Sequence, residues 1–300
     1  MERIGLIGAG RAGTAVGAAL AAAGHPLVGV TARSGASRER ATRLLPHVPV
    51  LTAGEVAERA DVVLVAVPDD LIGEVVDQLP LTSAQYVVHL SGAHGLEPLR
   101  ASEAVPVALH PAMTFPGGPV SLDGVMFTAT APDAARELVE RLVKSLGGQV
   151  QWVAEEHRAR YHAGLVHGAN HLTTLLSQAV DVLRAAGVAD PAATLRPLVT
   201  ATLDNTLRSG HHALTGPIAR GDVDTVAAHL AVLRDRVHRT YAELARATVD
   251  LAAADGRLDP DTAARFAEVL DGPVPDGLVP DGLVPDGVAG ERYRTGEAPR

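Results

Sequence analysis

The chain has 300 residues, 47% of them hydrophobic and only 3% aromatic, which is enough for two domains of ordinary size built mainly on Ala, Val and Leu. A formal net charge of −9 with no basic stripe argues against a nucleic-acid partner, because binding to that backbone needs clustered Lys and Arg. The absence of cysteine excludes disulfides, thiolate zinc sites and cysteine nucleophiles.

The first half of the chain alternates strand and helix patterns. We predict strands at 3–7, 27–32, 61–67, 86–90, 105–109, 125–130 and 149–153, with helices at 14–23, 37–45, 53–59, 71–79 and 132–146. This alternation is typical of an α/β domain with a doubly wound parallel sheet. We place this domain at residues 1–154.

The pattern changes after residue 155. Helical periodicity without strand patterns runs through 156–186, 191–209, 222–254 and 260–270, which predicts an all-helical second domain at 155–271. Residues 272–300 contain VPDGL, VPDGL and VPDGV in tandem. Pro and Gly at this density cannot sustain a helix or pack a core, so we predict a disordered tail.

The first residues enter a strand directly, without a charged leader or a cleavage site. The apolar stretch 15–24 is shorter than the about 20 residues that a bilayer requires. The sequence therefore predicts a soluble, cytoplasmic protein without a membrane partner.

A GxGxxG pattern, Gly8-Ala9-Gly10-Arg11-Ala12-Gly13, joins the first strand to the first helix. In this context the pattern is typical of the turn that binds a dinucleotide in a Rossmann domain. Gly8 would allow a tight turn, Gly10 would let the backbone approach a diphosphate, and Gly13 would let helix and strand pack closely. The backbone N–H groups at the start of the helix, including those of Arg11 and Ala12, would face the anion. The alternative is a purely structural glycine-rich turn.

The end of the second strand indicates which dinucleotide binds. NAD sites usually place Asp or Glu there, whereas this chain has Arg33 and Ser34, with Arg38 nearby. Arg and Ser can pair with a 2′-phosphate, so NADP is favoured over NAD. The alternative is that Arg33 is a solvated loop residue.

Polar or turn residues also follow three later strands. Val67-Pro68 precedes two aspartates, Ser91 ends the next strand, and His110 ends the one after it. Ligands of such sheets bind outside the carboxyl ends of the strands. We therefore expect Val67, Pro68 and Ser91 to contact the cofactor.

Histidines supply the candidate catalytic groups. With a near-neutral pKa, His110 could bind a carboxylate or pass a proton, although it could also simply cap its loop. His162 and Asn170 lie eight residues apart, so they would share a helix face as proton donor and substrate holder. His167 and His171 share another face, but without a third ligand we predict no metal.

The loop at 210–222 is unusual for a connection between helices. Thr215 and Arg220 could reach the site, and Asp222 could cap the next helix. A purely structural turn is an equal alternative.

Taken together, GxGxxG, AVPDD, LSGAHG, LHPAMTFPGG, YHAGLVHGAN and LTGPIARGD occur in order over residues 1–270. On these motifs the chain resembles a bacterial family of Rossmann-like proteins with a C-terminal DUF2520 domain. That family is similar to the 6-phosphogluconate dehydrogenase-like NAD(P) enzymes, which include β-hydroxyacid dehydrogenases, ketopantoate reductases, pyrroline-5-carboxylate reductases and prephenate dehydrogenases.

The resemblance implies an NADP-dependent oxidoreductase acting on a small carboxylate-bearing carbonyl, hydroxy or imine substrate, with 2-dehydropantoate as a candidate. It also implies a homodimer formed through the helical domain. Several of these enzymes use a lysine in the neighbourhood of His162, and the chain's only lysine, Lys144, precedes that helix. A missing lysine favours a second hypothesis, a non-catalytic NADP(H)-binding sensor or assembly protein. A third hypothesis is a deazaflavin as redox partner.

Overall fold

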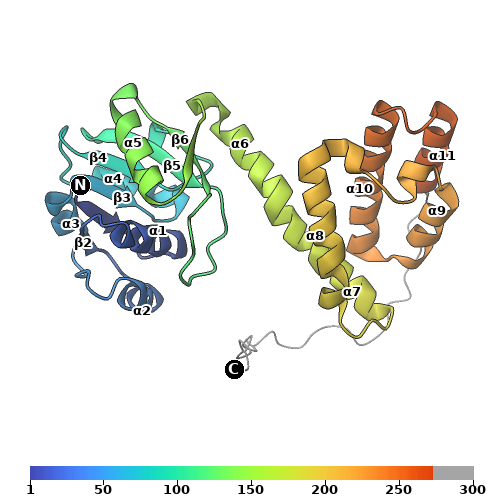
Figure 1. Cartoon of the computed structure of the whole chain (residues 1–300), viewed down its shortest axis with the longest axis horizontal. Helices are drawn as coiled ribbons and strands as arrows, with labels where there is room; N and C mark the ends of the chain where they lie inside the picture. Colours follow the sequence, from blue (N-terminus) through green and yellow to red (C-terminus); the bar gives the residue numbers. More distant parts are fainter. Residues whose placement is uncertain (273–300) are drawn as a thin grey trace. The chain divides into compact units, whose positions relative to one another are not determined.

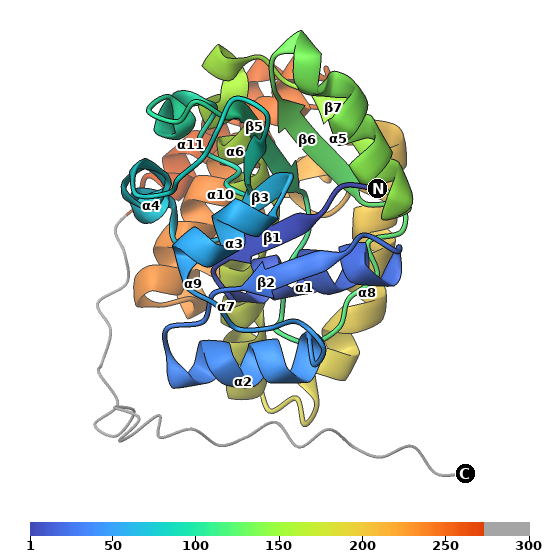
Figure 2. The ribbon, with the colours of Figure 1, turned by 90° about the vertical axis from the view of Figure 1, so that its left-hand side faces the viewer.

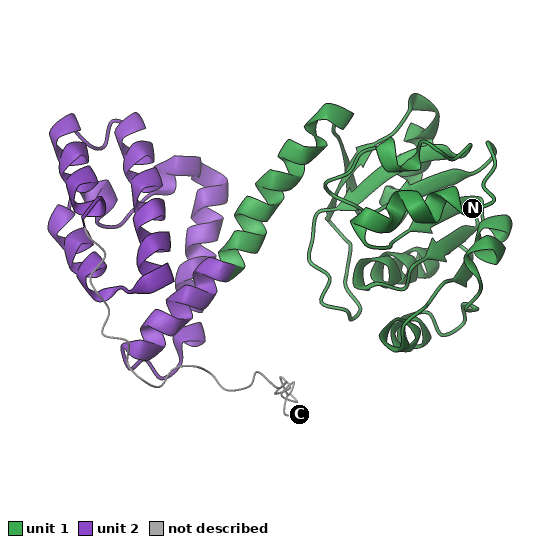
Figure 3. Cartoon of the chain, turned by 180° about the vertical axis from the view of Figure 1, so that it is seen from behind, with its two compact units in different colours: residues 1–173 green, residues 174–300 purple. Residues whose placement is uncertain are grey.

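The computed structural model describes residues 1–272, so the predicted tail lies outside the described residues except for Gly272. The chain divides into two compact units, residues 1–173 and 174–300 (Figure 3). The alternation of strands and helices ends before residue 155, and only helices follow, as the sequence predicts. The predicted domain boundary after residue 154 follows that change and stays a prediction.

Unit 1 contains a seven-stranded sheet in the order β2-β1-β3-β4-β5-β6-β7 (Figures 1 and 2). The strands are β1 Ile4–Ile7, β2 Leu27–Val30, β3 Val62–Val65, β4 Tyr86–His89, β5 Val105–Pro111, β6 Met126–Thr130 and β7 Gln149–Trp152. Its helices are α1 Arg11–Ala22, α2 Gly35–Leu44, α3 Ala53–Arg59, α4 Ile72–Asp77 and α5 Asp133–Ser145, with 3-10 turns at Asp69–Leu71 and Glu97–Leu99.

Helices cover both faces of this sheet. Residues of α1, α2 and α5 pack in one core with Val62 and Leu64 of β3, whereas residues of α3 and α4 pack in another with Val63 and Val65. Successive side chains of a strand point to opposite faces, which explains this division. The continuous apolar run in β3 is therefore buried on both sides, as predicted.

The third strand of the usual Rossmann order is reduced to a single bridge. Val50 pairs with Val30 of β2 in parallel, through bonds from the Val30 N–H to the Pro49 carbonyl and from the Leu51 N–H to the Val30 carbonyl, each 3.0 Å long. Counting this bridge, the strand order matches that of dinucleotide-binding sheets.

The sheet is mostly parallel, as predicted, with one antiparallel pair, β5 and β6. Residues 112–125 contain no helix to carry the chain back to the opposite sheet edge, so β6 begins where β5 ends. Helix α5 then supplies the crossover that makes β7 parallel to β6.

The remaining elements are helical. They are a 3-10 turn at Glu155–His157, α6 Arg158–Leu165, a π turn at Val166–Asn170, α7 His171–Ala185, α8 Pro191–Ser209, 3-10 turns at Gly210–Ala213 and Ile218–Arg220, α9 Val223–Val232, α10 Asp235–Ala254 and α11 Pro260–Leu270. The core of unit 2 is formed by buried residues of α9, α10, α11 and the turns beside them.

Two predicted helices are interrupted. The segment 156–186 contains the π turn, and the segment 222–254 breaks into α9 and α10 at residues 233–234. The second break has no Gly or Pro to signal it. Arg234 takes an extended backbone, its Nη1 donates to the carbonyls of Ala231 and Leu233, and Asp235 has φ of +49°.

Within residues 1–272, no helix is both long enough and apolar enough to cross a membrane.

Candidate functional site

The glycine turn joins β1 to α1, and its glycines have distinct constraints. Gly8 has φ of +100°, a Cβ there would lie 2.6 Å from the Ala66 carbonyl oxygen, and its N–H donates to Thr31 Oγ1 at 2.8 Å. A Cβ on Gly13 would lie 2.5 Å from Ala66 Cβ, so close packing of helix on strand is confirmed. A Cβ on Gly10 would meet only the Ala66 oxygen, at 3.5 Å.

Helix α1 begins at this turn without a capping side chain. Gly10 is its N-cap, and no acidic residue lies in the first turn. By contrast, Ser34 caps α2 and Thr52 caps α3. The first N–H groups of a helix need acceptors, and an anion can provide them. A cavity of about 520 Å³ adjoins this helix start. Its lining includes Gly10, Arg11, Ala12 and Gly13.

A second cavity of about 440 Å³ lies on the other side of the turn, at the end of β2. Arg33, Ser34 and Ser37 line it, and so does Arg40, whose Nη1 donates to the Ala9 carbonyl at 2.7 Å. Ser34 Oγ accepts the Ser37 N–H, which leaves its own hydroxyl proton available for a ligand. Two guanidinium groups and two hydroxyls at one cavity are suited to a phosphate.

The ends of β3 and β4 meet beside the first cavity. Val67, Pro68 and Ser91 line it, as does Asp69. Ser91 Oγ donates to Asp69 Oδ2 at 2.6 Å, lies 3.2 Å from His94 Nδ1, and accepts the backbone N–H groups two and three residues further on. Ser91 is thus buried and held by its own loop.

Three aromatic side chains gather next to that loop. His110 Nδ1 lies 2.8 Å from the Tyr161 hydroxyl, and the rings of His110 and His162 are 6.3 Å apart. A Cβ on Gly92 would lie 2.8 Å from His162 Cδ2 and 3.0 Å from His110 Nε2, so both imidazoles lie against this glycine.

The pKa of His110 is lower than the near-neutral value that we expected from the sequence. Burial, and secondarily the nearby Arg158 and His162, lower the pKa of His110 to about 4. A neutral imidazole can exchange a proton through hydrogen bonds, but it does not supply a cation for a carboxylate at pH 7.

The charge near this site comes instead from Arg158, the first residue of α6, which is 1% exposed. Its guanidinium donates to the carbonyls of Ser91 at 2.6 Å, His94 at 3.0 Å and Thr128 at 3.2 Å. Within residues 1–272 it forms no ion pair with a carboxylate. A guanidinium keeps its proton in proteins, so this buried positive charge persists at all ordinary pH values.

The loop after β4 is fixed from both sides. His89 Nε2 donates to the Gly95 carbonyl at 2.6 Å while its Nδ1 accepts the Ser91 N–H, which defines a neutral tautomer. Burial lowers the pKa of His89 to about 4. Glu155 accepts the Leu96 N–H at 2.8 Å from the other side.

Asn170 lies at the end of the π turn and is exposed. A π turn bonds residue i to i+5 and so holds about one residue more than an α turn. Positions eight apart across it correspond to about seven in a regular helix, so His162 and Asn170 still face the same way. The role of Asn170 stays a prediction.

Several residues of this site had no role in the sequence analysis: Arg40, Asp69, His94, Arg158 and Tyr161. Asp69 directly follows Val67-Pro68, and Tyr161 directly precedes His162. For these two residues, the only local sign of a role in the site was a position next to a predicted site residue. The contact of Arg40 with the glycine turn and those of Arg158 with the loop after β4 and with β6 depend on long-range folding.

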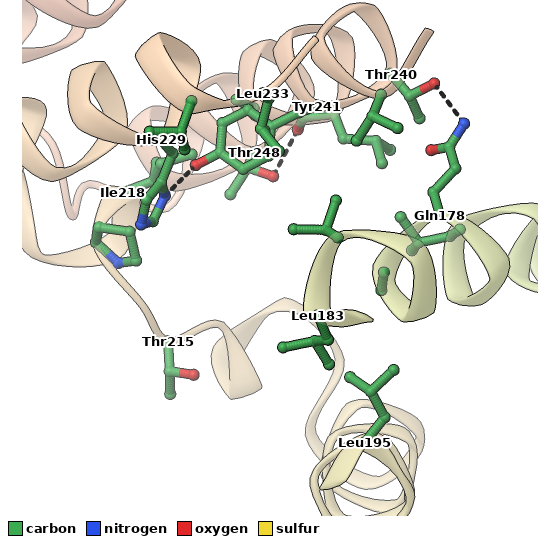
Figure 4. Close-up of a pocket in the computed structure, with 18 residues that line it drawn as sticks. Gln178, Leu183, Leu195, Thr215, Ile218, His229, Leu233, Thr240, Tyr241 and Thr248 are labelled. Atoms are coloured by element: carbon green, nitrogen blue, oxygen red, sulfur yellow. Dashed lines mark hydrogen bonds between the residues drawn. The ribbon is translucent and has the colours of Figure 1, made fainter. Parts of the chain in front are cut away.

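Unit 2 has an apolar cavity of about 570 Å³ of its own (Figure 4). Thr215, from the loop for which a structural and a substrate role were equal alternatives, lines it, as do the hydrogen-bonded pairs His229–Tyr241 at 2.8 Å and Gln178–Thr240 at 3.3 Å. Its described lining contains no Arg or Lys, so it does not suit a dinucleotide's phosphates. The predicted cap is confirmed, because Asp222 accepts the Thr225 N–H at the start of α9.

Two family models match the chain, the Rossmann-like domain over residues 2–111 and the domain of unknown function DUF2520 over residues 125–248. No curated protein sequence matches it.

Solved structures share its fold. A candidate NADP oxidoreductase from Bacteroides fragilis has 22% identity and a TM-score of 0.73, over 83% of this chain and 98% of its own. A Thermotoga maritima protein has 20% identity and a TM-score of 0.65, over 84% and 99%. The pyrroline carboxylate reductase of Plasmodium falciparum, solved with NADP bound, has 14% identity and a TM-score of 0.58, over 88% and 98%.

Proposed function

Because the chain belongs to the family that joins a Rossmann-like domain to a DUF2520 domain, we propose that it is an NADP-dependent oxidoreductase. It would move a hydride to or from a small carboxylate-bearing substrate with a carbonyl, hydroxy or imine group. Structural neighbours include an NADP-bound pyrroline carboxylate reductase and an imine reductase in complex with NAD⁺, which supports a nicotinamide cofactor. A cytoplasmic location, predicted from the sequence, is kept as part of this proposal.

The observation that carries the proposal is the uncapped start of α1 between two cavities. Beyond its own helix and chain neighbours, Gly10 has no protein atom closer than 3.5 Å to the position of a Cβ, which leaves room for a diphosphate to approach the backbone. The diphosphate would bind the N–H groups at Arg11–Gly13, and a 2′-phosphate would bind Arg33, Ser34 and Arg40. The bound cofactor would donate or accept the hydride.

Proton handling falls to His110 and His162. In the tautomer in which His110 Nδ1 accepts from the Tyr161 hydroxyl, the imidazole proton lies on Nε2, beside Gly92 and His162. From there the Nε2–H can donate a hydrogen bond to the oxygen or nitrogen of a substrate as negative charge develops. Asn170 would orient the substrate.

The charge of Arg158 favours an anionic substrate. Its three hydrogen bonds go to neutral carbonyls, so the guanidinium is in no direct ion pair, and the carboxylate of Asp69 at the same loop is bonded to Ser91 Oγ rather than to Arg158. This supports a carboxylate-bearing substrate, of which 2-dehydropantoate is one example.

We also propose a homodimer through the helical region. Helix α7 buries no residue within the described chain and α8 buries only Pro191. Leu203 and Leu207, one turn apart on α8, are 47% and 78% exposed. Such a face, beside an open apolar cavity, is suited to cover by a second copy.

The binding test is a calorimetric titration of the full chain with NADPH and with NADH. We expect NADPH to bind at least tenfold tighter, and Arg33→Ala to remove most of this preference without weakening NADH. Arg38→Ala is the matched control, since Arg38 is exposed on α2 and does not line either cavity.

The activity test follows NADPH oxidation with a panel of 2-oxo acids and cyclic imino acids. Turnover of at least one class is expected. Binding without any turnover would support the non-catalytic sensor instead, and the absence of binding by either nicotinamide cofactor would refute both.

A further inference from the structure

A second cluster of potential ligands lies in unit 2. His211 and His212 are in the 3-10 turn after α8, and Asp255 directly follows α10. His211 Nε2 lies 3.1 Å from Asp255 Oδ1, and His212 Nδ1 lies 3.5 Å from Oδ2. One ligand atom from each of the three lies within 4.8 Å of the others.

We propose that His211, His212 and Asp255 bind a divalent transition-metal ion of the zinc class. Two imidazole nitrogens and a carboxylate oxygen are the donor set of open zinc sites, which keep a further position for water. Metal–ligand bonds of about 2.0–2.2 Å in a tetrahedral site put neighbouring ligand atoms about 3.3–3.5 Å apart, close to the two observed nitrogen–oxygen distances.

The local backbone explains how adjacent histidines reach one point. Gly210, at φ of +57°, ends α8 and opens the turn, and the two imidazole rings then lie 4.3 Å apart. His211 presents its distal Nε2 and His212 its proximal Nδ1. Because Nε2 is farther from the backbone than Nδ1, the two neighbouring side chains can contact the same carboxylate. Neutral imidazole nitrogens are common metal ligands.

Arg257 contacts both Asp255 and the turn that carries the two histidines. Its Nε lies 2.8 Å from Asp255 Oδ2, while Nη1 and Nη2 donate to the carbonyls of Leu214 and His212. Hydrogen bonds to a ligating carboxylate orient it. The guanidinium charge also opposes a cation, so we expect weaker binding than at a site without it.

Exposure fits an open site. The side chain of Asp255 is 16% exposed, whereas those of His211 and His212 are 48% and 67% exposed, so an ion there would keep access to solvent. The alternative is a metal-free cluster in which the histidines only donate hydrogen bonds to the carboxylate. The histidine pair for which no metal was predicted, His167 and His171, is a different one, with Nδ1 atoms 3.4 Å apart.

The test uses the tag-free full chain titrated with Co²⁺ and followed by its ligand-field absorption, then with Zn²⁺ by calorimetry. We expect one equivalent per chain. The double variant His211→Ala/His212→Ala should weaken binding at least tenfold. The matched control is His167→Ala/His171→Ala, an exposed histidine pair that should leave binding unchanged.

NMR of the imidazole carbon-bound protons in the wild-type chain provides a readout that does not depend on variants. Zn²⁺ should shift the resonances of His211 and His212 first. The proposal is overturned if neither ion binds, if the control variant loses binding instead, or if Zn²⁺ leaves these two resonances unmoved.

Discussion

Gly10 and Gly13 belong to one turn but are constrained from different sides. Gly13 is constrained by protein atoms, with Ala66 Cβ 2.5 Å and the Gly8 oxygen 2.7 Å from the position of a Cβ, whereas Gly10 has room on the protein side. We predict that Gly10→Ala lowers NADPH affinity at least tenfold, about 1.4 kcal/mol, and changes the free energy of unfolding by no more than about 1 kcal/mol. Gly13→Ala should instead lower the free energy of unfolding by about 1–3 kcal/mol.

The two effects are separable by experiment. Calorimetric titration gives the affinity, and urea unfolding followed by tryptophan fluorescence gives the stability of unit 1, because the chain's single tryptophan is Trp152 in β7. Equal stability losses in both variants would contradict the assignment of Gly10 to the ligand.

His89 and His110 make stability depend on pH. Burial lowers the pKa of each to about 4 in the folded chain, against about 6.5 when unfolded. Between these values the unfolded chain binds more protons, so stability is complete above about pH 6.5 and is lost as the pH falls toward 4. We predict that the free energy of unfolding of unit 1 falls by about 2–4 kcal/mol between pH 7 and 5.

Urea unfolding of the wild type and of His89→Gln at several pH values checks this. Glutamine can still donate to the Gly95 carbonyl and accept the Ser91 N–H, so the variant should fold with about half the pH slope. His47→Gln, at an exposed position, is the control and should keep the full slope. If His89→Gln leaves the pH dependence of the free energy of unfolding unchanged, the loss of stability at low pH has another origin.

At the scale of elements, capping residues and periodicity in the sequence predicted the bounds of several helices. Helices α3, α8 and α11 have the bounds expected from the sequence, and each begins after a capping residue, Thr52, Asp190 or Asp259. The break between α9 and α10 has no such signal. The direction of β6 depends on where the chain returns to the sheet, which no pattern within the strand encodes.

The start of α6 ties three segments together through one side chain. Arg158 donates to carbonyls in the loop after β4 and in β6. Lysine keeps the charge but cannot satisfy all three acceptors with the same fixed geometry. We therefore predict that Arg158→Lys lowers the free energy of unfolding of unit 1 by about 2–4 kcal/mol, measured by Trp152 fluorescence in urea.

Arg160→Lys is the matched control on the same helix, because Arg160 is exposed. It should change the free energy of unfolding by less than about 0.5 kcal/mol. A wild-type stability for Arg158→Lys would mean that its three bonds add nothing to the fold.

For the molecule as a whole, only those site residues were predictable that the sheet topology brings to one edge. Gly8–Gly13, Val67, Ser91 and His110 all follow strand ends, and parallel strands bring such ends to one sheet edge. The hydrogen bond and the low pKa of His110 were not predictable, because they result from burial in the folded chain and from Tyr161 and Arg158, about 50 residues further along the chain. Surfaces that lack a partner also become visible only once the helices are packed.

The exposed leucines of α8 lead to a prediction about assembly. Leu203 and Leu207 are one helical turn apart and lie on the same face. If a second copy covers them, Leu203→Arg with Leu207→Arg should halve the molar mass measured by light scattering and keep the helical circular dichroism, because neither side chain packs in the core of unit 2. Leu251→Arg, at an exposed leucine of α10, should leave the mass unchanged. A wild-type chain with monomer mass, or a dimer that survives both arginines, would exclude α8 as the interface.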